Sequence, residues 1–96
     1  MKIAIKNFKE NPSVSLRRAG YVFLGNENNE MSFVKRLGGA DYPRFHIYAK
    51  AEENALTINI HLDQKRGTYG AARHHGEYEN SAELSAEAER IKNILI

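Results

Sequence analysis

Hydrophobic and polar residues alternate in two neighbouring segments of the chain, residues 42–50 and 55–63. Alternation with a period of two is typical of half-buried β-strands, which place successive side chains on opposite faces of a sheet. One face is apolar in both segments and carries Phe45, Ile47, Ala49, Leu56, Ile58, Ile60 and Leu62. The two segments therefore predict paired strands with one apolar face and one polar face.

The four residues 51–54 separate these segments and are expected to form the turn of a hairpin. A turn of this length places Lys50 opposite Ala55. In the same register Arg44 lies opposite His61, with their Cβ atoms about 5 Å apart.

The N-terminal part of the chain predicts a short strand and a short helix. Residues 2–6 alternate between polar and apolar side chains. The dipeptide Asn11-Pro12 is typical of a helix N-cap followed by proline at the first helical position. We expect the helix to cover residues 13–19 and to end at Gly20, where a helix C-terminus often needs a left-handed backbone.

Residues 21–25 and 31–37 predict two further strands, joined by the polar, asparagine-rich turn 26–30. The expected pairing puts four apolar side chains on one face: Val22, Leu24, Met31 and Phe33. Residues 64–79 have no clean period and contain three glycines. This segment is expected to be a loop, and loops of such length often carry function.

The C-terminal part of the chain predicts an amphipathic helix. Asn80 followed by Glu83 fits a capping box. Apolar residues then recur at helical spacing, at Leu84, Ala88, Ile91 and Leu95. The outer face of this helix is charged, with Glu87 and the pair Glu89 and Lys92 expected on it.

Together these elements predict an α+β fold in the order β-α-β-β-β-β-α. Its antiparallel sheet has four to five strands, with a short N-terminal helix and the amphipathic C-terminal helix packed on one face. We expect residues 1–96 to form a single domain, because 96 residues are too few for two hydrophobic cores.

Composition points to a cytoplasmic protein. The chain has no cysteine, so disulfides, thiolate metal sites and cysteine nucleophiles are excluded. No apolar stretch approaches the roughly 20 residues that a membrane span requires, and residues 1–6 lack the apolar core of a signal peptide. Residues 1–73 hold 12 basic against 7 acidic side chains, whereas residues 74–96 hold 2 against 5. A basic body with an acidic tail could mark contact with an anionic partner. Alternatively, the acidic residues at the start of the last helix complement its dipole.

The polar face of the predicted hairpin is the main candidate for a functional surface. It offers cations, aromatic rings and hydrogen-bonding groups together: Tyr42, Arg44, His46, Tyr48, Lys50, Asn59 and His61. Cations can neutralise phosphates, and rings can stack on bases. The sequence therefore favours a small binding module for an anionic ligand such as RNA or DNA, without a cofactor, over an enzyme.

Two alternatives use the same face. Imidazole and carboxylate groups could bind a divalent metal such as zinc, with ligands drawn from His46, His61, Asp63, His74 and Glu77. The spacing matches no metal-binding motif, and Arg44 beside the site would repel a cation. Alternatively, His46 and His61 could act as the acid and base of a hydrolytic, nuclease-like site that uses no metal.

A further alternative is a protein-interaction domain with no catalytic activity. Exposed strands at the edges of the sheet could pair with a partner or with a second copy of the chain, giving a homodimer.

Overall fold

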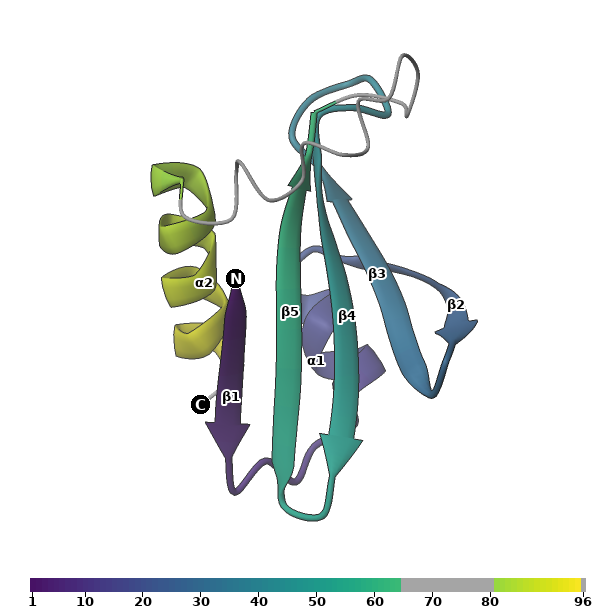
Figure 1. The fold of residues 1–96 in the computed structure, drawn as a ribbon, viewed down its shortest axis with the longest axis vertical. Helices are drawn as coiled ribbons and strands as arrows, with labels where there is room; N and C mark the ends of the chain where they lie inside the picture. The colour runs from purple at the N-terminus through teal and green to yellow at the C-terminus, as the bar shows by residue number, and fades with distance from the viewer. Residues whose placement is uncertain (65–80, 96) are drawn as a thin grey trace.

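The structure is a computed structural model that describes residues 1–64 and 81–95. Its elements are β1 Lys2–Lys6, α1 Pro12–Arg18, β2 Val22–Glu27, β3 Glu30–Arg36, β4 Arg44–Glu52, β5 Ala55–Asp63 and α2 Ala82–Leu95. The five strands form one antiparallel sheet in the order β1-β5-β4-β3-β2 (Figure 1). The predicted α+β class, element order and antiparallel sheet are confirmed.

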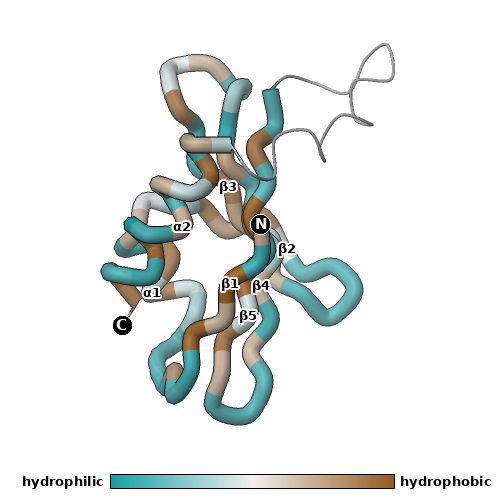
Figure 2. The backbone as a smooth tube through the Cα atoms, turned by 60° about the vertical axis from the view of Figure 1, so that its left-hand side comes forward, coloured by the Kyte–Doolittle hydropathy of each residue, from teal (hydrophilic) through white to brown (hydrophobic). Residues whose placement is uncertain are grey.

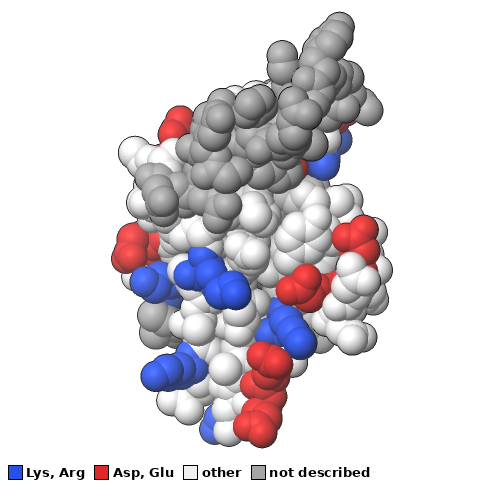
Figure 3. All heavy atoms as spheres, viewed as in Figure 1, with Lys and Arg blue, Asp and Glu red and all other residues white. Residues whose placement is uncertain are grey.

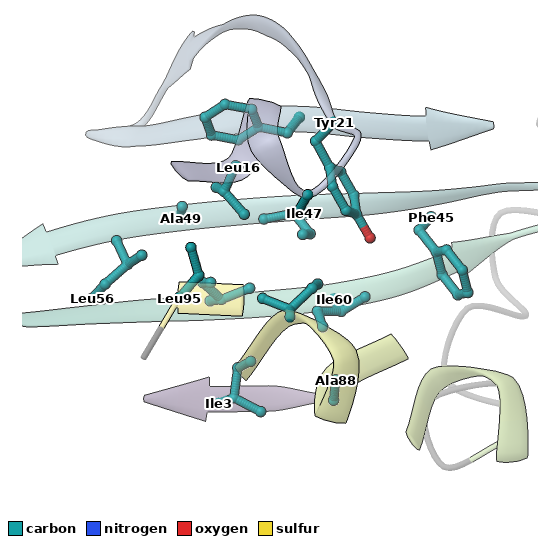
Figure 4. Close-up of a cluster of buried hydrophobic side chains, with 14 of the residues drawn as sticks. Ile3, Leu16, Tyr21, Phe45, Ile47, Ala49, Leu56, Ile60, Ala88 and Leu95 are labelled. Carbon is teal, nitrogen blue, oxygen red and sulfur yellow. The ribbon is translucent and has the colours of Figure 1, made fainter. Parts of the chain in front are cut away.

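The hydrophobic core lies between one face of the sheet and the two helices. Apolar side chains of the strands point toward the helices, and α2 contributes the stripe that the sequence predicted (Figure 4). Hydrophilic residues concentrate at the β2–β3 and β4–β5 turns (Figure 2). We call the opposite side of the sheet, which neither helix covers, the outer face. Neither α1 nor α2 is both long and apolar enough to cross a membrane.

Helix α1 forms as its local sequence predicts. The Asn11 side chain accepts hydrogen bonds from the backbone N–H groups of Ser13 at 2.8 Å and Val14 at 3.3 Å. These bonds satisfy N–H groups that a helix start otherwise leaves without a partner. Gly20 follows the helix with a φ of +100°, a conformation that glycine adopts without strain.

Helix α2 departs from the prediction at Glu87. The Ser81 hydroxyl caps its first turn by accepting from the N–H of Leu84 at 3.1 Å, and the predicted cap, Asn80, lies outside the described residues. Glu87 is buried instead of lying on the charged surface. Its carboxylate accepts from the Tyr21 hydroxyl at 2.6 Å and from Arg90, which compensates for the loss of water.

The β2–β3 hairpin also differs from the prediction. Asn28 and Asn29 have φ values of +52° and +66° and form a two-residue turn, so both strands extend further into the expected five-residue turn. A bulge at Leu24 shifts the register between Phe23 and Gly25. Phe23 lies opposite Phe33 and packs on its ring, and Val22 lies opposite Val34, so the predicted apolar face of Val22, Leu24, Met31 and Phe33 does not form. All three of Val22, Phe23 and Leu24 are exposed.

The register of the β4–β5 hairpin is shifted by two residues from the predicted one. Glu53 and Asn54 alone form the turn, with Glu53 at a φ of +49°. Arg44 therefore lies opposite Asp63, and not opposite His61. Because the shift is even, every side chain keeps its predicted face, but its neighbours change.

Candidate active site

Polar side chains from β3, β4 and β5 meet on the outer face, the side of the sheet seen in Figure 1. The strand registers arrange them in three rows across the sheet. The rows are Ser32, Tyr48 and Asn59; Val34, His46 and His61; and Arg36, Arg44 and Asp63. Acidic and basic side chains are interspersed over this face, and neither sign dominates (Figure 3).

His46 lies at the centre of this arrangement and contacts one residue on each neighbouring strand. Its Nε2 is 2.8 Å from the hydroxyl oxygen of Ser32 on β3. Its Nδ1 is 3.4 Å from Oδ2 of Asp63 on β5. A carboxylate beside Nδ1 favours the tautomer that carries its proton there, which leaves Nε2 free to accept from the Ser32 hydroxyl.

Burial separates these three groups from bulk water. The side chains of His46 and Asp63 are 14% and 8% exposed, and Ser32 is buried as well. A carboxylate in such a position needs a positive partner. Arg44 supplies one, with its Nε 3.7 Å from Oδ2 of Asp63. The guanidinium of Arg44 also lies over the Tyr42 ring, with its carbon 4.5 Å from the ring centre, so two contacts hold it in place.

Three rings pack next to one another beside the Ser32–His46 pair. The Tyr48 ring centre is 4.6 Å from that of His46 and 6.1 Å from that of His61. Burial raises the pKa of Tyr48, and the nearby carboxylates of Glu27, Asp63 and Glu30 raise it further. The cation of Arg44 acts on the pKa of Tyr48 in the opposite direction, but the net effect is to keep the phenol neutral at physiological pH.

A hollow of about 200 Å³ opens beside Ser32 and His46. Its remaining lining is Leu24, Gly25, Asn26, Glu27 and Tyr48. The bulge in β2 forms one wall, and Gly25 has a φ of +148° there, a conformation that side-chain-bearing residues rarely adopt. Bulges often lie next to active sites because they redirect the chain locally. A small molecule in this hollow would lie against both the hydroxyl and the imidazole.

Of the other residues predicted for this surface, Asn59 and His61 lie half-buried in the rows described above. Lys50 is exposed near the β4–β5 turn, where its amine lies 3.6 Å from Glu52. His74 and Glu77 fall outside the described residues. Within residues 1–64 and 81–95, no three histidine or acidic side chains are grouped so that they could hold a metal ion.

Ser32 is the member of this site that sequence reasoning missed. The alternation of residues 31–34 contains the necessary signal, since Ser32 and Val34 share the face opposite Phe33. That alternation does not say which residue of β4 lies beside Ser32. Only the pairing of two strands brings the hydroxyl to His46.

Comparison with protein-family models, curated proteins and solved structures gave no match.

Proposed function

We propose that this chain is a hydrolase that uses Ser32 as nucleophile, His46 as general base and Asp63 as the group that orients the base. The contact that supports this most directly is the 2.8 Å approach of the Ser32 hydroxyl to Nε2 of His46, with Asp63 on the other side of the imidazole. Serine hydrolases share a general geometry in which the nucleophile is hydrogen-bonded to a base, and a third group orients that base. The proposal takes up the metal-free hydrolytic alternative raised by the sequence and adds the nucleophile.

The proposed reaction proceeds through an acyl-enzyme. The Ser32 oxygen attacks an ester carbonyl carbon while its proton passes to Nε2 of His46. The tetrahedral intermediate then breaks the bond to the leaving oxygen, which takes the proton back from the imidazolium. A water molecule then attacks the carbonyl carbon of the acyl group while His46 again takes up the proton. The bond to the Ser32 oxygen breaks, which releases the carboxylic acid and regenerates Ser32. Asp63 and Arg44 stay ionised throughout, and Asp63 stabilises the transient imidazolium.

The hollow indicates which substrates would fit. Asn26 is the lining side chain whose amide could donate a hydrogen bond to the developing oxyanion, a role that asparagine fills in other hydrolases. Glu27 lines the same space and disfavours an anionic substrate. A volume of about 200 Å³ accommodates a short acyl group. We therefore propose a small neutral or cationic ester as the substrate class.

The expected contact with RNA or DNA is less well supported than hydrolysis. Arg44, its central cation, is held between Asp63 and Tyr42. The hollow beside the rings is flanked by carboxylates. Nucleic-acid binding through this face stays a prediction.

Hydrolysis of p-nitrophenyl acetate tests the proposal. We expect Ser32→Ala and His46→Gln to lower the rate by at least about 100-fold, because each removes a partner of the proton transfer. Ser85→Ala is the matched control, since this serine is exposed on α2, away from the sheet. Exposed histidine side chains cleave this ester slowly without forming a catalytic site. This background rate of hydrolysis persists in Ser32→Ala.

Two further readouts separate the alternatives. Excess chelator should leave the rate unchanged, and bis(p-nitrophenyl) phosphate should not be cleaved. If folded Ser32→Ala retained the full esterase rate, serine catalysis would be wrong. Cleavage of the phosphodiester that depended on His46 but not on Ser32 would favour the nuclease-like alternative instead.

A further inference from the structure

The two edges of the sheet differ in a way that bears on association. The edge strand β1 exposes Lys2, Ala4 and Lys6, and charged edges of this kind resist pairing with another chain. The opposite edge strand, β2, exposes three consecutive apolar side chains. Val22, Phe23 and Leu24 are 61%, 43% and 54% exposed. Only one of the two edges is protected by charge.

We infer that β2 pairs with β2 of a second copy of this chain, in antiparallel orientation, to give a two-fold symmetric dimer with a continuous ten-stranded sheet. Pairing would satisfy the free backbone groups of the edge and cover the apolar run. The symmetry axis would pass near Phe23, at the middle of that run. This inference does not depend on the proposed hydrolysis.

The charges at the two ends of β2 favour a second copy as the occupant. The end formed by the β2–β3 turn is acidic, with Glu27 and Glu30. At the other end of the hairpin, β3 finishes with Lys35 and with Arg36, which pairs with Asp41 at 3.0 Å, and α1 precedes β2 with exposed Arg17. Antiparallel self-pairing brings the acidic end of each copy to the basic end of the other. Parallel pairing would instead place like charges together.

A two-fold axis repeats this match on both sides of the interface. The bulge at Leu24 limits the regular part of the new ladder to the few residues around Phe23. The dimer should therefore be weakened by salt, and by a charge placed in the apolar run.

Sedimentation equilibrium tests the inference without reference to activity. We expect the wild-type chain to dimerise, and Leu24→Glu and Val22→Glu each to raise the dissociation constant roughly tenfold or more. Ala4→Glu is the matched control: it adds the same charge at an exposed position of the other edge strand and should leave the dimer intact. Circular dichroism establishes that each variant is folded.

Cross-linking locates the contact directly, since the chain has no cysteine of its own. Under mild oxidation, Phe23→Cys should give a covalent dimer, because a disulfide requires Cα atoms within about 7 Å of each other and the axis brings the two copies of this residue together. Ala4→Cys should not. A wild-type chain that stays monomeric at its highest soluble concentration would overturn the inference. A dimer cross-linked through Ala4→Cys, or insensitive to both glutamate substitutions in β2, would do the same.

Discussion

Replacing Tyr21 by phenylalanine tests the buried network that ties α2 to the segment between α1 and β2. The Tyr21 hydroxyl donates to Oε2 of Glu87 at 2.6 Å, and both residues are buried. Arg90 donates to both oxygens of the same carboxylate, at 2.9 and 2.8 Å, and to the carbonyl of Ala19 at 2.6 Å. The substitution removes one of three donors and leaves the packing of the ring unchanged.

A hydrogen bond to a charged group contributes about 1.5–3 kcal/mol to stability. Glu87 keeps both bonds from Arg90, so its charge stays paired and the lower part of that range applies. We expect Tyr21→Phe to lower the free energy of unfolding by about 1.5–2 kcal/mol. For a domain of this size the melting temperature should fall by roughly 6–15 °C.

Urea denaturation followed by far-ultraviolet circular dichroism measures this change. The midpoint should fall while the slope with denaturant stays constant, because the surface exposed on unfolding is unaltered. Tyr42→Phe is the control: Tyr42 is only half-buried, and its ring would remain under Arg44. A loss below about 0.5 kcal/mol for Tyr21→Phe, which is within the range of ordinary surface substitutions, would refute the assigned network.

Four other predictions concern pH and ligands. Burial alone would raise the pKa of Glu87, but hydrogen bonds from Arg90 and Tyr21 outweigh it and hold the pKa below its ordinary value, so stability should fall as acid titrates this group below about pH 4. Burial, and after it the hydrogen bond to Glu87, raises the pKa of Tyr21, so stability should also fall above about pH 10. This alkaline loss should be smaller in Tyr21→Phe, and equal losses of the two proteins in pH-dependent urea titrations would contradict the assignment. Binding of a fluorescent RNA, if it occurs through the outer face, should weaken steeply between low and moderate salt and fall in Lys50→Ala, whereas salt-independent binding would contradict contact with phosphates. A zinc site should raise the melting temperature in wild type but not in His61→Ala, and no shift in wild type would rule it out.

Sequence periodicity identified the two faces of β4 and β5 because that signal is local. Each side chain of β4 and β5 alternates in place, and the apolar stripe of α2 follows helical spacing, so neither depends on the rest of the fold. Register is not local in this sense. It depends here on a two-residue turn in which Glu53 adopts a φ of +49°, and a glutamate in the sequence does not predict this conformation.

The candidate site illustrates the consequence. The sequence placed His46 and Asp63 on one face, but the predicted register put Arg44 opposite His61 and Tyr42 opposite Asp63, whereas Arg44 itself lies opposite Asp63. Ser32 comes from a third strand, and its contact with His46 requires the β3–β4 pairing as well. Glu87 was misplaced for a related reason: a charged residue on a helix normally faces water, and the partners that permit its burial include Tyr21, 66 positions away in the chain.

Covalent labelling of Ser32 tests the proposed function most directly. An alkyl fluorophosphonate reacts with a serine that an adjacent base activates, and peptide mass spectrometry locates the adduct. We expect the adduct on Ser32 in the wild-type chain, little of it in His46→Gln, and none on the exposed Ser85. Full esterase activity without an adduct on Ser32, or an adduct that forms equally well in His46→Gln, would contradict nucleophilic catalysis by this serine.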